Sequence, residues 1–199
     1  ICKATDENGQ YLSVDAIVDH MNFLMMAAHD TITSSVTSLV RLLAQNPEWQ
    51  DRLRAEMLAV APAGQGIGHN ALGELELTEM AFKESLRLIP PVPSIPRRAL
   101  KAFEFGGYRI PAGTPVGINV NYTHHMEEYF PDPEKFDPMR FAPEAVRGRH
   151  KYAWVPFGGG AHMCLGLHFA YMQAKIFLHH VLTTNRITLE PGYAPEWQA

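Results

Sequence analysis

Hydrophobic residues recur with a helical period over residues 13–44, which predicts one long helix at the start of the chain. Ser13 or Asp15 is its expected N-cap, and Pro47 marks its end. The middle of this segment, residues 23–28, reads Phe-Leu-Met-Met-Ala-Ala and is apolar on nearly every face. Because a helix that is apolar all round is usually a buried one, we expect it to cross the interior of the folded protein.

Three further helices are predicted, and prolines mark the limits of two of them. Pro47 stands at the favoured first position of a helix over 48–60. A helix over 77–88 ends at a pair of prolines. The segment between these helices is rich in Gly and Ala and reads as a surface loop over 61–73. A last helix is expected over 165–183.

Short β-rich segments predict strands at 102–105, 108–110 and 115–120, with a Gly-Gly turn between the first two. Residues 186–189 could add another strand. Residues 122–152 are polar, aperiodic and punctuated by prolines, and so long a loop inside a compact domain implies a specific role. The predicted fold class is mainly α with a small antiparallel β-sheet.

Composition narrows the protein class by exclusion. The chain has 199 residues, 46% hydrophobic and 19% charged, which is typical of a soluble globular protein, and its net charge of -4 argues against a nucleic-acid partner. Two cysteines far apart in sequence do not suggest a disulfide scaffold. No apolar run approaches the roughly 20 residues of a membrane span, and no signal-peptide pattern is present. We expect a cytoplasmic location, although the chain begins with Ile1 and reads as part of a longer protein, so an anchor ahead of it would be invisible.

Cys164 has the most suggestive surroundings in the chain. It lies in the stretch from Phe157 to Gly166 that reads Phe-Gly-Gly-Gly-Ala-His-Met-Cys-Leu-Gly. Consecutive glycines let the main chain approach a bulky planar group, and the start of the following helix stabilises a thiolate. Haem iron uses such a ligand. Two other interpretations of the loop alone are a buried apolar cysteine and a nucleophile of a hydrolase or transferase, with His162 or His168 as its base.

The pattern Phe-x-x-Gly-x-(Arg/His)-x-Cys-x-Gly resembles the haem loop of the cytochrome P-450 family of haem-thiolate monooxygenases. The resemblance implies that the cofactor is haem b (iron protoporphyrin IX) and that Cys164 is the ligand of its iron. It also implies that His162 and Arg97 bind the haem propionates. Further haem contacts are implied for Phe157, Gly158, Gly166, Ala27 and Ala28.

A second resemblance lies in the pair Glu84 and Arg87, which share one face of the predicted third helix. Such pairs are common on solvated helices, but this helix end is apolar, and its proline-rich exit resembles the segment after the Glu-x-x-Arg pair of the family. Residues 136–141 match the family pattern Phe-x-Pro-x-Arg-Phe. The resemblance implies that Arg140 joins Glu84 and Arg87 in a buried ion network with a structural role.

A third resemblance lies in the long helix, where Ala27 to Thr31 is similar to (Ala/Gly)-Gly-x-(Asp/Glu)-Thr, with Ala28 at the usual glycine. Short side chains here would let a flat macrocycle lie against the helix. The resemblance implies that Asp30 and Thr31 are catalytic and relay protons when dioxygen is activated. Taken alone, these residues read more simply as a polar turn in which Thr31 bonds back to a carbonyl.

The implied function is a monooxygenase that inserts one oxygen atom of O2 into a hydrophobic organic substrate. Electrons would come from a separate ferredoxin or flavoprotein reductase, because the chain has no flavin or nucleotide fingerprint. Adjacent histidines at 124–125 and 179–180 lack zinc-site spacing and are interpreted as surface or core residues. The substrate pocket implied by the resemblance is lined by Leu24, Val92, Ser94 and Ile95.

The resemblance covers residues 1–199 and corresponds to the carboxy-terminal, haem-binding half of a cytochrome P-450 domain. The amino-terminal half, with the helices that roof the substrate pocket, would be absent. A non-catalytic fragment with partial or no haem binding is therefore the main alternative. Without that half, part of the apolar segment 23–28 should lie exposed, and we expect the chain to self-associate through this surface.

Overall fold

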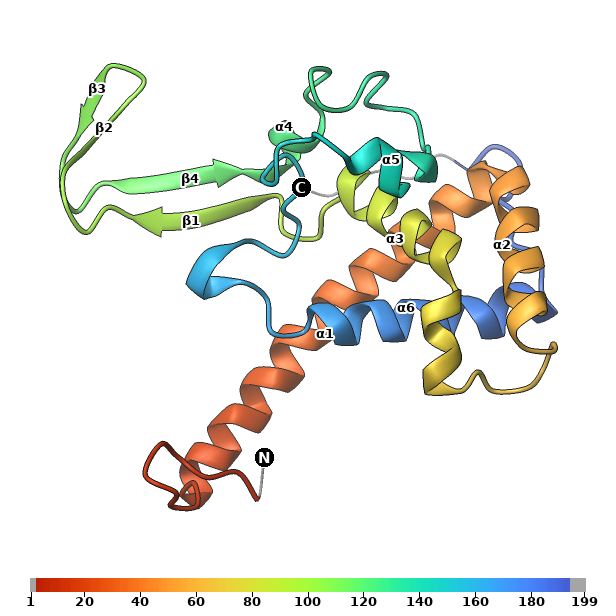
Figure 1. Ribbon diagram of the computed structural model, residues 1–199, viewed down its shortest axis with the longest axis horizontal. Coiled ribbons are helices and arrows are strands. Elements are labelled where there is room, and N and C mark those ends of the chain that lie inside the picture. Colours follow the sequence, from red (N-terminus) through yellow and green to blue (C-terminus); the bar gives the residue numbers. More distant parts are fainter. Residues whose placement is uncertain (1–2, 194–199) are drawn as a thin grey trace.

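In the computed structural model, which describes residues 3–193, the chain forms a helical body from which two arms project (Figure 1). One arm is the first part of the long helix, at the lower left of the view, and the other is formed by the β-strands, at the upper left. In chain order the elements are α1 (Val14–Gln45), α2 (Pro47–Val60), η1 (His69–Glu74), α3 (Glu76–Leu88), β1 (Ser94–Arg98), β2 (Phe103–Phe105), β3 (Tyr108–Ile110), β4 (Pro115–Asn119), α4 (Val120–His124), η2 (Pro138–Phe141), α5 (Pro143–Val146), η3 (Gly160–His162) and α6 (Leu167–Thr184).

The long helix α1 begins and ends where its capping signals place it. The Ser13 hydroxyl accepts a hydrogen bond from the Ala16 N–H at 3.2 Å, which satisfies one free donor of the first turn. Pro47 opens α2 directly after the end of α1. The second half of α1 belongs to the core, where Leu39 and Leu43 are fully buried.

The first half of α1 lies outside the body (Figure 1). Phe23 is 53% exposed and Met26 is 70% exposed, and the buried residues of α1 begin only at Ser35. The interior position expected for the apolar segment is therefore not found among the described residues. The exposure that we expected for the chain on its own is found.

Four helices, α1, α2, α3 and α6, enclose the main hydrophobic core. Leu53 of α2, Phe82 of α3 and Leu178 of α6 are each almost completely buried in it. The ring of Phe82 packs edge-on against Tyr171 with centroids 5.6 Å apart, a favourable geometry for two aromatic rings. This core fixes α3 and α6 relative to each other, and these helices flank the cysteine loop.

The aperiodic stretch 122–152 wraps a second, smaller core on α3. Phe130 and Phe141 are buried there, and the Arg149 guanidinium lies over the Phe130 ring at 4.6 Å. Short helices α4, η2 and α5 interrupt the stretch, and none of them was predicted. Trp154 packs against this cluster, so the smaller core lies directly ahead of the cysteine loop.

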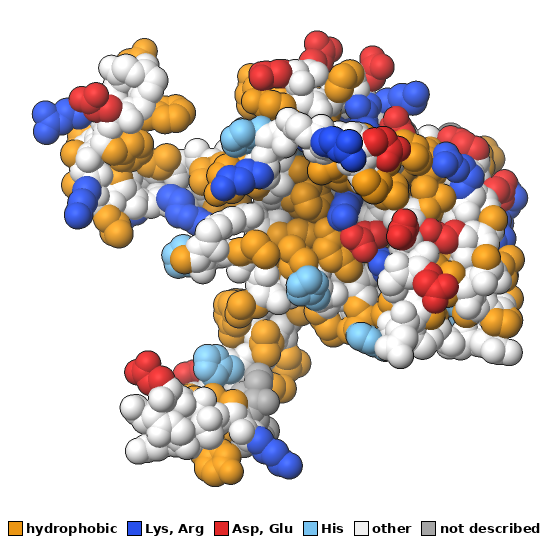
Figure 2. All heavy atoms as spheres, in the orientation of Figure 1, with side chains coloured by type: hydrophobic (Ala, Val, Ile, Leu, Met, Phe, Trp, Pro, Cys, Tyr) orange, Lys and Arg blue, Asp and Glu red, His pale blue; other side chains and the backbone are white. Residues whose placement is uncertain are grey.

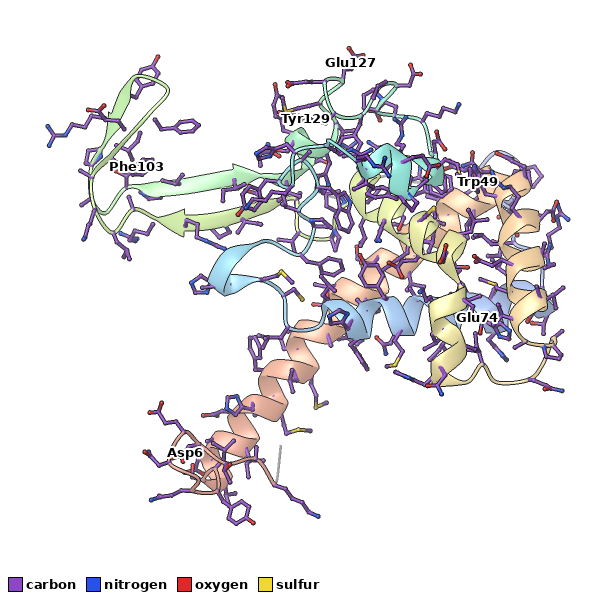
Figure 3. All side chains as sticks on the ribbon, in the orientation of Figure 1. Asp6, Trp49, Glu74, Phe103, Glu127 and Tyr129 are labelled. Carbon is purple, nitrogen blue, oxygen red and sulfur yellow. The ribbon has the colours of Figure 1, made fainter. Side chains whose placement is uncertain are left out.

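The predicted fold class, mainly α with antiparallel β-structure, is confirmed, but the strands form two separate two-stranded sheets instead of one. Strands β2 and β3 form a hairpin, with Gly106 and Gly107 at the positive φ values of 57° and 82° that its turn requires. A separate antiparallel pair joins β4 to β1, a strand that was not predicted and that contains Pro96. Proline is tolerated in a strand whose edge is free. The hairpin residue Phe103 lies far from Trp49 of α2, at the other end of the molecule (Figure 3).

Several predicted elements and limits differ from those of the structure. Strand β4 stops one residue early, because the Asn119 side chain accepts the Tyr122 N–H at 2.9 Å and starts α4. The loop after α2 contains η1 from His69. Residues 186–189 form no strand, since the Gln50 amide takes both hydrogen bonds of the Ile187 backbone, at 2.7 and 3.0 Å.

Candidate functional site

The cysteine loop is a tight glycine turn closed by a backbone hydrogen bond. Gly158 has φ of +72°, a conformation that L side chains rarely adopt. The Cys164 N–H donates to the Phe157 carbonyl at 3.0 Å, which fixes the backbone of the cysteine. The helix α6 has Gly166 as its N-cap and starts at Leu167, two residues later than predicted. The Cys164 side chain is exposed just ahead of that helix start.

The loop opens into an apolar pocket of about 720 Å³, a size typical of ligand sites. Residues of α1, β1, the cysteine loop and α6 line the pocket. Figure 2 shows hydrophobic side chains gathered at the centre of this face and along the projecting part of α1. The structure brings together most of the predicted site residues: Leu24, Ala27, Ala28, Thr31, Val92, Ile95, Arg97, Phe157, Gly158, His162, Cys164 and Gly166.

Among the residues predicted to bind haem or substrate or to act in catalysis, Asp30 and Ser94 lie outside the lining of this pocket. The Asp30 side chain is 89% exposed and its carboxylate lies 2.8 Å from Nδ1 of His29. The Thr31 hydroxyl donates to the Ala27 carbonyl at 2.9 Å, which is the simpler of the two interpretations of this turn. The Asp30 carboxylate and the Thr31 hydroxyl therefore each bond to another group, and no hydrogen bond joins the two side chains. Ser94 sits at the end of the β1–β4 ladder.

The residues of this pocket fit a flat, apolar macrocycle with an iron centre and acidic edges. Ala27 and Ala28 offer a wall of short side chains, and Cys164 offers one soft ligand atom. The Arg97 guanidinium, whose hydrogen bond among the described residues goes to its neighbour Pro96, has further donors for a carboxylate. His162 is a second exposed donor in the same lining.

The other chemistries considered for Cys164 find less support. No hydrogen bond joins the Cys164 thiol to a histidine within residues 3–193, whereas a cysteine nucleophile is activated by a neighbouring base. Across the same residues no three His, Cys, Asp or Glu side chains gather as metal ligands. Cys164 is exposed, so it is no buried apolar cysteine. The second cysteine, Cys2, lies outside the described residues.

Glu84 and Arg87 form a completely buried ion pair on α3. Nε and Nη2 of Arg87 donate to the two carboxylate oxygens of Glu84 at 2.7 and 2.9 Å. The backbone N–H of Asp137 donates to the same carboxylate at 3.0 Å, and Nε of Arg140 lies 3.4 Å from it. Burial raises the pKa of the Glu84 carboxyl, while Arg87 and the Asp137 N–H oppose that rise. Two guanidiniums and one N–H surround the carboxylate and stabilise its ionised form against the effect of burial.

Arg87 also holds the aperiodic stretch in place. Its Nη1 donates to the carbonyl of His124 at 3.0 Å, and its Nη2 donates to the carbonyls of Pro133 and Lys135 at 2.7 and 3.3 Å. One buried side chain thus satisfies three carbonyls of a segment that has little secondary structure of its own. These contacts give a physical reason for the order of so long a stretch.

His124 makes specific contacts that the sequence did not reveal, since the sequence indicated only an ordinary surface or core residue. His124 is completely buried, and its Nε2 accepts the backbone N–H of Val155 at 2.9 Å. Burial lowers its pKa to about 4, so the ring is neutral at neutral pH. No spacing marks this residue in the sequence, because it ends a five-residue helix in an aperiodic region. The neighbouring His125 instead contacts the Asn121 carbonyl.

Comparison with known proteins gives a consistent result. The family model of cytochrome P450 matches residues 1–197. The chain is 40% identical to a putative cytochrome P450 136 of Mycobacterium tuberculosis, over 99% of this chain and 40% of that protein. It is 36% identical to human cytochrome P450 4X1, over 96% of this chain and 38% of that protein. It is 37% identical to a β-amyrin 28-monooxygenase of Solanum lycopersicum, over 89% of this chain and 37% of that protein.

A solved structure has the same fold. The retinoic acid bound cyanobacterial CYP120A1 superimposes with a TM-score of 0.90 at 34% identity, over 96% of this chain and 44% of that one. The chain therefore spans about 40% of the length of the curated relatives it matches. None of the described helices has the length and apolarity needed to cross a membrane. The glycine turn with its cysteine, the buried Glu84–Arg87 pair and these matches lead to one conclusion: the chain belongs to the cytochrome P450 family.

Proposed function

We propose that residues 1–199 are the carboxy-terminal, haem-binding portion of a haem-thiolate monooxygenase that inserts one oxygen atom of O2 into an apolar organic substrate. The observation that carries this proposal is the exposed Cys164 thiol at an apolar pocket of about 720 Å³. Proteins of this family bind haem b, and haem supplies the activation of O2 when it is bound.

The chain's own residues would bind and orient this cofactor. Cys164 would bind the iron as a thiolate, in a position fixed by the hydrogen bond from its N–H to Phe157. Arg97 and His162 would bind the two propionates, which need cationic or hydrogen-bonding partners inside a protein. Ala27, which lines the same pocket, would leave room for the edge of the macrocycle.

Proton delivery would depend on Thr31 and Asp30, and the contacts of the two side chains support a different role for each. The Thr31 hydroxyl lines the pocket and donates its proton to the Ala27 carbonyl, so its lone pairs remain available to accept one. Asp30 is held by His29 at 2.8 Å and would have to leave that contact to hand a proton to Thr31. We therefore propose that Thr31 relays protons inside the pocket, releasing its own hydrogen as it accepts another, and that Asp30 exchanges protons with solvent.

The proposed substrate is an apolar organic molecule. Leu24, Val92 and Ile95 line the pocket with aliphatic side chains, which favour such a ligand by burying its apolar surface. One structural relative was solved with retinoic acid bound, and one sequence relative is a β-amyrin 28-monooxygenase. Electrons would come from a separate ferredoxin or flavoprotein reductase.

Oxygen-isotope labelling tests this function. A longer protein that carries the chain would be supplied with haem, a ferredoxin with its reductase, and retinoic acid as an apolar probe substrate under oxygen-18 gas. We expect one labelled oxygen atom in the product, and none from labelled water. Product oxygen that derives from water would contradict monooxygenation.

A second candidate function is supported by the projecting half of α1. Met25 and Met26 are 69% and 70% exposed there, beside the pocket, so the pocket lacks a cover on that side among the described residues. The 199-residue chain by itself would then be a non-catalytic fragment with weak haem binding. The same labelling experiment on residues 1–199 alone tests this second candidate, because labelled product from the chain by itself would contradict it.

A further inference from the structure

His124 connects the buried ion pair on α3 to the cysteine loop. Its carbonyl accepts from Nη1 of Arg87 at 3.0 Å, and Nε2 of its ring accepts from the Val155 N–H at 2.9 Å. The residue has no exposed surface. One side chain and its own backbone therefore face two different structural units, the Glu84–Arg87 pair on one side and the segment that leads to Cys164 on the other.

The hydrogen bond to Val155 specifies the proton on the His124 ring. A backbone N–H can only donate, so Nε2 must present its lone pair and Nδ1 must carry the hydrogen. That Nδ1 is buried and makes no hydrogen bond of good geometry among the described residues, although the backbone of Leu86 and Arg87 lies close to the ring, and a poorly satisfied donor costs free energy. The ring therefore has a poorly satisfied donor at Nδ1, while its Nε2 accepts the Val155 N–H. An apolar side chain would fill the same space without that cost.

Val155 starts a short run of backbone hydrogen bonds that ends at the cysteine. The Val155 carbonyl accepts the Gly158 N–H at 3.0 Å, and the Phe157 carbonyl accepts the Cys164 N–H at 3.0 Å. One residue earlier, Nε1 of Trp154 donates to the Lys83 carbonyl of α3 at 3.3 Å. The loop is thus attached to the helical body immediately before its glycine turn, and the shortest of these attachments is made by His124.

We propose that His124 is a positioning residue for the cysteine loop: by accepting the Val155 N–H, it fixes where Cys164 presents its thiol to the pocket. The significance of that position for haem rests on the function proposed above. The contact itself belongs to the chain and exists without a cofactor. It is therefore testable in the protein free of haem.

The wild-type chain gives the first test. In the 199-residue chain labelled with nitrogen-15, we expect a scalar coupling across the hydrogen bond between the Val155 backbone nitrogen and Nε2 of His124. The ring shifts should report the proton on Nδ1. Absence of the coupling, or a proton on Nε2, overturns the proposal, and no variant has to fold for this result.

Matched variants give the second test. In His124→Gln the side-chain oxygen reaches about as far as Nε2 and keeps an acceptor for Val155, whereas the shorter His124→Asn does not. Amide hydrogen exchange at Val155 should accelerate about tenfold in the Asn variant, as expected for loss of one hydrogen bond. It should change less than about twofold in His124→Gln and in the control His125→Gln.

The pattern of exchange separates positioning from general destabilisation. The proposal expects the acceleration at Val155 and Cys164 to exceed that of core amides in α6. Equal acceleration throughout the core, equal acceleration in the Gln and Asn variants, or unchanged exchange at Val155 each overturns it. An insoluble Asn variant leaves the decision to the wild-type coupling.

Haem loading gives a separate readout. After reduction and addition of carbon monoxide, the Asn variant should show a smaller fraction of thiolate-type spectrum than the wild type, and the Gln variant should restore it. An equal fraction in the wild type and the Asn variant overturns the positioning role. If the wild type itself gives no such spectrum, the haem function fails, and the exchange pattern still decides the role of His124.

Discussion

Replacement of Arg87 by alanine should unfold or strongly destabilise the protein. Arg87 has no exposed surface and donates to both oxygens of Glu84 and to the carbonyls of His124, Pro133 and Lys135. Without it, the buried Glu84 carboxylate keeps only the Asp137 N–H and the more distant Arg140.

The magnitude follows from the loss of one partner of a buried pair. Such a loss costs about 3–5 kcal/mol, which is a large part of the roughly 5–15 kcal/mol that stabilises a typical domain. With a urea dependence of about 2 kcal/mol per molar, the unfolding midpoint should fall by about 2 M. Arg87→Lys keeps the charge, but a lysine cannot donate to both Glu84 oxygens and all three carbonyls. Its unfolding midpoint should therefore lie between those of the wild type and Arg87→Ala.

The matched control is Arg186→Ala. Arg186 also pairs with a carboxylate, Asp51 at 3.2 Å, but both side chains are 54% exposed. An exposed pair contributes at most about 1 kcal/mol. Urea unfolding followed by tryptophan fluorescence, with the soluble fraction on expression as a second measure, compares the variants. The reasoning is refuted if Arg87→Ala shifts the midpoint no further than Arg186→Ala, or if it holds haem normally and only turns over more slowly.

Three further predictions concern the pH response, proton delivery and self-association. Folding lowers the pKa of His124 from 6.5 to about 4, so the unfolded chain binds the proton first: the free energy of unfolding should lose on the order of 3 kcal/mol as pH falls from 6.5 to 4, and an equal pH slope in His124→Gln would contradict this. Thr31→Ala, in a longer protein that carries the chain, should keep haem and substrate binding but divert electrons to hydrogen peroxide; unchanged product per electron pair would exclude the proposed role. Residues 1–199 should bind hydrophobic dye and associate in sedimentation, and the double substitution Met25→Lys with Met26→Lys should reduce both; a wild-type monomer without dye binding would count against the exposed apolar face.

The four long helices α1, α2, α3 and α6 were predictable because their signals are local. A serine hydroxyl at Ser13 and a proline at Pro47 fix the two ends of α1 within the sequence itself. The Glu84 and Arg87 side chains are close because a helix brings residues three apart together. The glycine turn before Cys164 is likewise set by residues next to one another.

The remaining features depend on partners that are distant in the sequence. Ile187 lost its expected strand because Gln50, 137 residues earlier, supplies both hydrogen bonds. Strand β1 forms despite Pro96 because β4 pairs with it. His124 gains its role only when the fold brings Val155 to its ring. The Asp30 carboxylate contacts His29 and not Thr31. Both residues are adjacent to Asp30 in the sequence, so spacing alone could not predict which of them it contacts.

The carbon monoxide difference spectrum of the reduced, haem-supplied protein tests the assignment of Cys164 most directly. The chain has two cysteines, so Cys2→Ser is the matched control for Cys164→Ser. The wild type and Cys2→Ser should both give a thiolate-type spectrum, and Cys164→Ser should lose it. A thiolate-type spectrum that persists in Cys164→Ser would contradict the assignment of Cys164 as the ligand of the haem iron.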